Sequence, residues 1–358
     1  MSVLLTDRTS IETDWTCGMK RWWYKEEGGT GIVPATEPAY FAQGRALHEL
    51  LDKIALADDP RSVLECCLPP AAEDNILKWE EWARLLGWLT AFVEWVEIPD
   101  RAAGWRTLKT EHELILDRDP LMIACTPDRI SQHTPSGRVR YWEYKTTGAF
   151  DLVKWSDYWP HAVQLHIGLQ AMKEEMRLSD EAHVFGQVVG FAKGFDKDGK
   201  LRHPYVWGWF KGDPDMGGVW LREWVNTSPR PWLRPTWEYP GGPAEWVRFL
   251  GEETARDVIP LSRHVFVDQR MVDLVVSERT ERERLVQSIR DRCLTDRDLR
   301  TRVFPMHLGT CRPMIGAPCA YLSACWNASV NADPLASGEF VRREPHHAIE
   351  IAMKGTQR

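Results

Sequence analysis

The chain has 358 residues, enough for one elaborated domain or two ordinary ones with a sizeable core. Its net charge of −7 argues against a sequence-wide attraction to nucleic acid or anionic membranes, although a local basic groove stays possible. No apolar run approaches the roughly 20 residues that span a bilayer, and the N-terminus has no export signal, so we expect a cytoplasmic protein.

Apolar residues at helical spacing predict a helix over about 38–57 and a second over about 74–97. Three strand-forming runs follow, and the turn signals between them predict an antiparallel meander: "TLKTEHELILD", "LMIACTPDRISQ" and "RVRYWEYKTT". We expect a helix over about 155–177 next, followed by the strands "HVFGQVVGFAK" and "PYVWGWF". This order predicts an α/β fold with a central mixed sheet flanked by helices.

The rest of the chain is expected to form a helical and cysteine-bearing extension. The Pro- and Trp-rich segment "SPRPWLRPTWEYPGGP" predicts a loop or linker, and a charged helix is expected over about 270–296. The chain from about 303 is expected to be irregular, and it holds three cysteines. We expect a single domain over 1–358, with its core at about 15–215, a linker and helical extension at 216–300, and a cysteine-rich segment at 303–330.

The strand "RYWEYKTTG" carries two charges where a buried strand would have none. Because side chains alternate along a strand, Glu143 and Lys145 share a face with the apolar Val139 and Tyr141. A strand that leaves a core for a polar pocket has this pattern, and so does an edge strand with a surface ion pair. Residues elsewhere in the sequence are needed to decide between a polar pocket and a surface ion pair.

Asp128 stands 15 positions before Glu143, and adjacent strands can bring the two carboxylates together at one sheet edge. Their repulsion favours a cation between them, and oxygen ligands suit Mg²⁺ or Mn²⁺. Lys145 could then orient a water molecule or stabilise charge on a phosphate. Taken alone, the three residues could equally be a surface charge cluster.

These residues resemble the PD-(D/E)xK nuclease motif, with Pro127 before Asp128 and "EYK" at Glu143, Tyr144 and Lys145. The resemblance implies a restriction-endonuclease-like core in which Asp128, Glu143 and the carbonyl of Tyr144 hold the metal ion. The lysine then assists the attacking water.

Two further segments are similar to the RecB-like branch of that family. "GRALHELL" resembles its G-x-x-x-H helix and implies that His48 is a metal ligand. "AVQLHIGLQ" resembles its Gln motif and implies that Gln164 holds the lysine or contacts DNA, although Gly168 replaces the Tyr often found there. Glu111 resembles an additional acid of some members.

Four cysteines resemble the ligands of a 4Fe-4S cluster in AddB-type, CRISPR-associated and phage exonucleases: Cys17, Cys311, Cys319 and Cys325. Seven residues separate Cys311 from Cys319, a wider spacing than in the usual C-x-x-C pair of such clusters. Such a cluster would join the two ends of the chain, and a Cys₄ zinc site is the alternative. The remaining cysteines are expected to be buried structural residues: Cys66, Cys67, Cys125 and Cys293.

The resemblance implies a Mg²⁺- or Mn²⁺-dependent DNA exonuclease that serves recombination or repair, encoded by a phage or prophage and active in a bacterial or phage-infected cell. It implies DNA ends or single strands as substrate and a recombinase or single-strand annealing protein as partner. The alternatives are a CRISPR-adaptation nuclease working with integrase partners and an inactive DNA-binding module of the same fold.

Three other features have ordinary explanations. The aromatic residues Trp22, Trp23 and Tyr24 could stack on a single strand, but packing around Cys17 is the favoured reading. "GFDKDGKL" nearly fits a phosphate-binding loop but fits a hairpin turn better. His346 and His347 are expected to be solvated.

Overall fold

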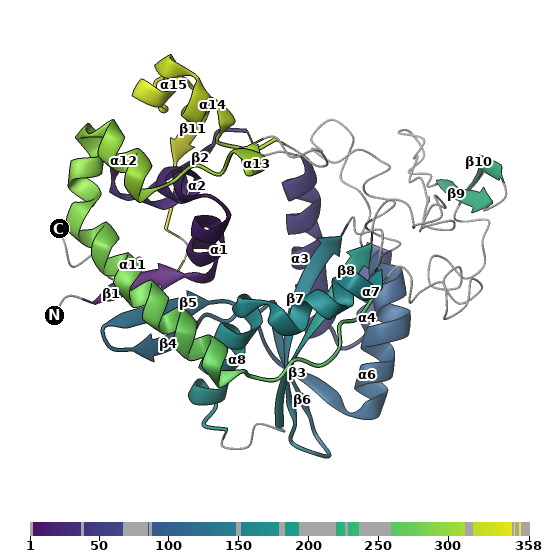
Figure 1. Cartoon of the computed structure of the whole chain (residues 1–358). Coiled ribbons are helices and arrows are strands. Elements are labelled where there is room, and N and C mark those ends of the chain that lie inside the picture. Colours follow the sequence, from purple (N-terminus) through teal and green to yellow (C-terminus); the bar gives the residue numbers. More distant parts are fainter. Residues whose placement is uncertain are drawn as a thin grey trace.

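Two β-sheets lie at the centre of the computed structural model (Figure 1). It describes residues 3–36, 39–66, 85, 88–147, 152–178, 183–192, 220–225, 228–235, 259–311, 318–345, 347 and 351. The larger sheet has the order β3-β6-β7-β8, formed by Trp105–Thr110, Arg129–His133, Val139–Thr147 and Val184–Ala192. Strands β7 and β8 run parallel while the other neighbours are antiparallel, so the predicted mixed sheet is confirmed.

The second sheet has the order β1-β5-β4, formed by Leu4–Asp7, Leu121–Cys125 and Leu114–Arg118. The first two predicted runs of the meander therefore each divide into two strands that belong to different sheets, and the expected three-strand meander is wrong. The breaks have a local cause. Pro127 cannot donate to a ladder, and Glu111 has a φ of 45°, a backbone conformation that ends a strand.

Strand β7 separates two apolar cores, as its alternation predicts. Trp142 and Tyr144 pack with α3 (Ala39–Leu56) and with the helix that runs through Trp88 and Phe92. On the opposite face, Val139 and Tyr141 pack with α8 (Val163–Glu175), and the same core includes residues of β1, β4, β5 and α11 (Gln269–Thr295). In Figure 1, α3 and α6 stand on one side of the larger sheet, and α8 and α11 lie on the other.

The predicted helices differ from the structure mainly at their ends. Helix α3 and helix α11 match the predictions. Much of the 74–97 segment lies outside the described residues; its last part is a π-helical turn at Val93–Glu97, and the helix continues past it as α6 at Ile98–Ala103. The 155–177 helix is two helices, α7 (Leu152–Tyr158) and α8, joined by a 3₁₀ turn that contains Pro160.

The two ends of the chain fold together into a unit that we call the terminal lobe. Its N-terminal part contains α1 (Arg8–Thr16), α2 (Gly18–Arg21), a π-helical turn (Trp22–Glu26) and β2 (Ile32–Pro34). Its C-terminal part begins with α12 (Arg297–Val303). The chain from about 303 was expected to be irregular but forms short elements: α13 (Leu308–Cys311), α14 (Leu322–Trp326), α15 (Ala328–Ala332) and β11 (Phe340–Arg342). Strands β2 and β11 pair antiparallel.

A buried network of charges fixes the N-terminal helices to α11. Arg21 has no exposed surface and donates two hydrogen bonds to Glu283 of α11 at 2.7 and 2.8 Å. Asp14 accepts from Arg279 at 2.7 Å and from Arg282 at 2.9 Å. These cations hold the pKa of Asp14 at about 2 even though burial acts to raise it.

Other parts of the described chain complete the fold. Helix α4 spans Pro60–Cys66. The expected linker contains an antiparallel hairpin of β9 (Trp220–Val225) and β10 (Ser228–Pro235), which corrects that prediction. The segments "PYVWGWF" and "GFDKDGKL", together with Cys67 and His346, lie outside the described residues. No helix in the described part of the chain is long and apolar enough to cross a bilayer.

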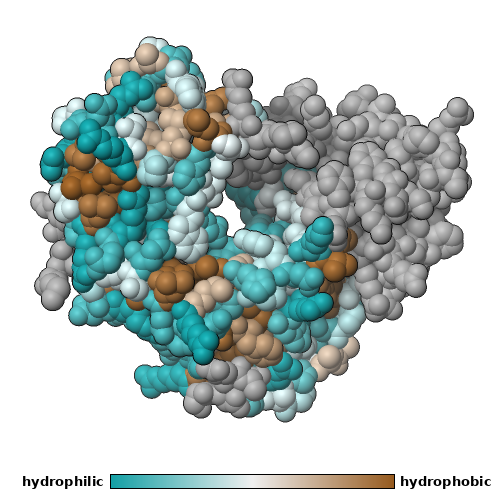
Figure 2. Space-filling model, in the orientation of Figure 1, coloured by the Kyte–Doolittle hydropathy of each residue, from teal (hydrophilic) through white to brown (hydrophobic). Residues whose placement is uncertain are grey.

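Figure 2 shows that this face of the molecule is hollowed between the terminal lobe and the larger sheet. In Figure 1 the helices α1 and α3 stand on either side of the corresponding region.

Candidate active site

Asp128 lies at the break between β5 and β6, one residue before β6 begins. Its backbone N–H donates to the carbonyl of Trp142 at 3.2 Å, and its Oδ2 accepts a hydrogen bond from the backbone N–H of Tyr144. The aspartate is 5% exposed, so these contacts fix the carboxylate against β7. The two acidic motif segments therefore meet as predicted, but at a strand break rather than at the end of a meander strand.

His48 reaches Asp128 from α3. Leu47, Leu51 and Ile54 anchor that helix in the core, and the His48 side chain is one-third exposed. Its Nδ1 lies 3.1 Å from Oδ1 of Asp128. Burial acts to lower the pKa of His48, but the Asp128 carboxylate raises it to about 10, so the metal-free imidazole is charged at neutral pH.

Glu111 completes a group of three close ligand atoms. Its Oε1 lies 3.8 Å from Nδ1 of His48, and its N–H donates to the carbonyl of Asp128 at 3.3 Å. A φ of 45° is strained for a glutamate, and such strain is concentrated at functional sites. Among the described residues, His48, Glu111 and Asp128 offer ligand atoms within 4.8 Å of one another, and one imidazole with two carboxylates suits a divalent ion.

Asp52, one helical turn after His48, adds negative charge to this group. Burial raises its pKa to about 6, and the neighbouring Glu111 and Asp128 carboxylates act in the same direction. A concentration of carboxylates of this kind attracts a cation, which fits the chemistry expected of the group.

Glu143 lies outside that close group and has different partners. It has no exposed surface. Its Oε1 accepts from the hydroxyl of Tyr141 at 3.1 Å and from the guanidinium of Arg8, and its Oε2 accepts from Nζ of Lys145 at 2.8 Å. Three donors therefore hold the second acid of the motif, and Lys145 contacts it directly.

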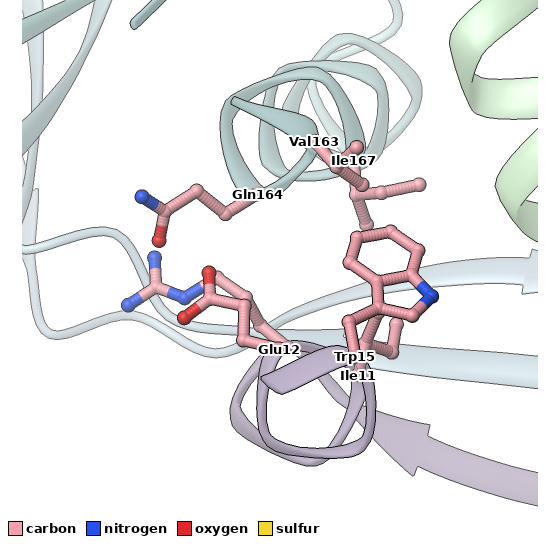
Figure 3. A pocket seen from close by; sticks show the side chains of 7 residues that line it. Ile11, Glu12, Trp15, Val163, Gln164 and Ile167 are labelled. Atoms are coloured by element: carbon pink, nitrogen blue, oxygen red, sulfur yellow. The ribbon is translucent and has the colours of Figure 1, made fainter. Parts of the chain in front are cut away.

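Gln164 lies in the first turn of α8 and lines a small recess between α8 and α1 (Figure 3). Figure 3 shows Glu12 and Gln164 on one side of this recess and Trp15 with Ile167 on the other. Arg8 also lines the recess, so Gln164 is placed beside the group that binds Glu143. Burial raises the pKa of Glu12.

Gly168, where the motif often has Tyr, packs against Tyr141. A Cβ at this position would lie 2.4 Å from the Tyr141 hydroxyl oxygen, closer than real Cβ contacts. The glycine therefore leaves the space that the Tyr141 hydroxyl needs in order to reach Glu143.

The four predicted cluster ligands gather in the terminal lobe, where Cys17, Cys319 and Cys325 belong to one apolar core and Cys311 is also buried. The N–H of Cys319 donates to the carbonyl of Cys311 at 3.0 Å. Burial raises the pKa of Cys325 to about 11, and the nearby thiols of the other three add to this.

The expectations for the surrounding residues are met in most cases. Trp22 and Trp23 have no exposed surface, and the indole N–H of Trp23 donates to Sγ of Cys325 at 3.2 Å, which confirms packing. Cys125 and Cys293 are buried as expected. His347 was expected to be solvated but is buried, with Nδ1 2.8 Å from Oε2 of Glu113.

Arg8 and Asp52 are site residues that the sequence did not predict. The pattern of Asp7 with Ser10 three residues later is a helix N-cap signal and could have predicted a helix from residue 8. No local pattern, however, connects residue 8 with a glutamate 135 positions later.

The chain matches the family described as the PD-(D/E)XK nuclease superfamily over residues 9–326. No curated protein matches the chain. The matched range includes every residue of the site described above except Arg8.

Proposed function

The chain belongs to the PD-(D/E)XK nuclease superfamily, and on that basis we propose that it is a Mg²⁺- or Mn²⁺-dependent deoxyribonuclease. The observation that carries this proposal is the position of Asp128, whose two carboxylate oxygens lie against His48 and against the Tyr144 backbone of the "EYK" strand. DNA is the substrate that such a family implies.

Asp128, His48 and Glu111 would hold the divalent ion, with Glu143 and the carbonyl of Tyr144 as further ligands. When bound, such an ion activates a water molecule and neutralises charge on the phosphate. Hydrolysis joins the water oxygen to phosphorus and breaks a phosphorus–oxygen bond, and negative charge increases on the phosphate oxygens as it proceeds. The Lys145 ammonium group, held by Glu143 at 2.8 Å, would orient the water or stabilise that charge.

Gln164 would position Lys145 or the DNA backbone from the first turn of α8. Its place beside Arg8 in the recess supports this assignment. The hollow between the terminal lobe and the larger sheet, bordered by the helices that carry Arg8 and His48, offers a route for DNA to reach these residues.

The experiment is digestion of end-labelled linear DNA and of circular DNA with Mg²⁺ or Mn²⁺. We expect Lys145→Ala to lose at least about a hundredfold in rate, whereas Lys109→Ala, which removes an exposed lysine paired with Glu175, keeps the wild-type rate. No cleavage by the wild type, or undiminished cleavage by Lys145→Ala, refutes the mechanism. Binding of DNA without cleavage would support a DNA-binding module instead.

We also propose that the protein is a RecB-like exonuclease that acts on DNA ends in recombination or repair, together with a recombinase or single-strand annealing protein, and that it is phage or prophage encoded. The arrangement of His48, Asp128, Glu143 and Gln164 around one site supports that branch. Cleavage of linear but not covalently closed circular DNA tests the exonuclease part. A single domain is proposed because Leu4 and Val272 pack in the same core as Tyr141.

For the terminal lobe we propose a 4Fe-4S cluster held by Cys17, Cys311, Cys319 and Cys325. When bound, it would cross-link the two ends of the chain. The packing of Cys17, Cys319 and Cys325 around one apolar core, with Cys311 hydrogen-bonded to Cys319 through the backbone, supports a centre with four thiolate ligands, and a Cys₄ zinc site is the alternative.

The absorbance spectrum of anaerobically purified protein tests the cluster. We expect an absorbance band at about 400 nm, as iron–sulfur centres with four thiolate ligands give, and its loss in Cys17→Ser. Cys125→Ser, which changes a buried cysteine of the core below the sheet, is the matched control. A colourless protein that contains stoichiometric zinc would refute the cluster.

A further inference from the structure

Arg8 is held in place by the start of α1. Asp7, the last residue of β1, caps the helix by accepting hydrogen bonds from the N–H and hydroxyl of Ser10 at 2.8 and 2.7 Å. Lys25 binds the same carboxylate at 3.0 Å, and β1 pairs with β5 next to the strand break at Asp128. The first residue of the helix is therefore anchored at the edge of the site, with its guanidinium on Glu143.

The contacts of Glu143 use most of its hydrogen-bonding capacity. An ionised carboxylate has about four acceptor positions, two on each oxygen. Arg8 and Tyr141 occupy both positions of Oε1, and Lys145 occupies one position of Oε2. One position, on Oε2, is left for a metal ion.

A two-metal site places its ions about 3.5–4 Å apart and needs carboxylate oxygens for both. Here a second ion at Glu143 would have to displace the guanidinium of Arg8 or the ammonium of Lys145. The guanidinium stays charged at all working pH values, so it is a permanent cation beside Glu143. Arg8 already provides there the positive charge that a second ion would bring.

We propose that Arg8 is a positioning residue that fixes the orientation of Glu143 and replaces a second metal ion, so that the site binds one divalent ion per chain. This inference rests on the proposed nuclease function. To that function the inference adds a residue outside the recognised motifs, Arg8, and the number of divalent ions that the site binds. A merely structural ion pair would affect folding but would leave the number of bound ions unchanged.

The test counts Mn²⁺ ions bound to the full-length protein by calorimetry and follows DNA cleavage in parallel. Arg8→Met removes the charge and the donors at similar length, and Arg8→Lys restores the charge. Arg118→Met is the matched control, because Arg118 forms an exposed ion pair with Glu174 away from the site. Thermal unfolding is measured for each variant to confirm that it folds.

We expect one Mn²⁺ per chain for the wild type, Arg8→Lys and Arg118→Met, and a second, weaker Mn²⁺ for Arg8→Met. Because misplacing a reacting group can cost about a hundredfold, Arg8→Met should lose about that factor in kcat, with KM changed less than about threefold. The kcat of Arg8→Lys should be at least about tenfold higher than that of Arg8→Met.

Two Mn²⁺ ions on the wild type would overturn the inference, and this count needs no variant to fold. One ion on Arg8→Met with wild-type affinity and rate would also overturn it. Failure of the proposed function is distinguishable, because it would appear as a wild type that cleaves no DNA at all.

Discussion

Metal binding should compete with a proton on His48. A histidine binds a metal ion only through a neutral nitrogen, whereas the Asp128 carboxylate raises the pKa of His48 to about 10 in the metal-free protein. Below that pH each ion that the proposed site binds through His48 would displace one proton. At pH 7.5 the pKa lies about 2.5 units higher, which weakens the apparent metal affinity by up to roughly 300-fold.

The apparent affinity for Mg²⁺ should therefore rise by up to about tenfold for each pH unit between pH 7 and 9. Calorimetry in two buffers of different ionisation enthalpy measures the protons released, and we expect close to one per ion. His48→Asn, which keeps a neutral ligand without a titrating ring, should release far fewer protons and show a flatter pH dependence. Proton release near zero for the wild type would refute the reasoning.

Other perturbations test the core, the terminal lobe and the metal requirement. Gly168→Ala should destabilise the fold by about 1–3 kcal/mol in urea unfolding and slow cleavage, since the new methyl collides with the Tyr141 hydroxyl; equal stability would contradict the packing. Asp14→Asn should cost up to about 2 kcal/mol at neutral pH, because the pKa of Asp14 lies near 2 rather than 3.8. That stabilisation is complete above pH 4 and is lost as the pH falls through 2, so the two proteins should converge there in unfolding measurements. EDTA should abolish cleavage and added Mn²⁺ should restore it; cleavage that persists in EDTA would exclude the metal.

Periodicity was sufficient to predict the elements whose faces are clearly apolar or polar. Helix α3 with His48 and the two-faced strand β7 are found where their patterns place them, because their alternation of burial is set locally. The split of the 155–177 helix also has a local signal, because Pro160 lies in the 3₁₀ turn between α7 and α8.

The division of two strand runs between two sheets is a different kind of error. Pro127 is a local signal for one of the two breaks, but tertiary pairing with β1 on one side and with β7 on the other assigns the resulting strands to different sheets. The contact of Arg8 with Glu143 depends on the same long-range assembly. For that reason the sequence predicts Glu143 as a motif residue but does not predict that Arg8 holds it.

The pairing of β2 with β11 has a consequence for the order of events during synthesis. A ribosome releases the N-terminus first, and contacts between distant parts of a chain form late. Helix α1 packs against elements that are translated about 260 residues afterwards, since Asp14 binds Arg279 and Arg282. Helix α1 therefore acquires these partners only when translation is almost complete. A nascent or truncated chain would therefore carry both motif acids before the terminal lobe is complete.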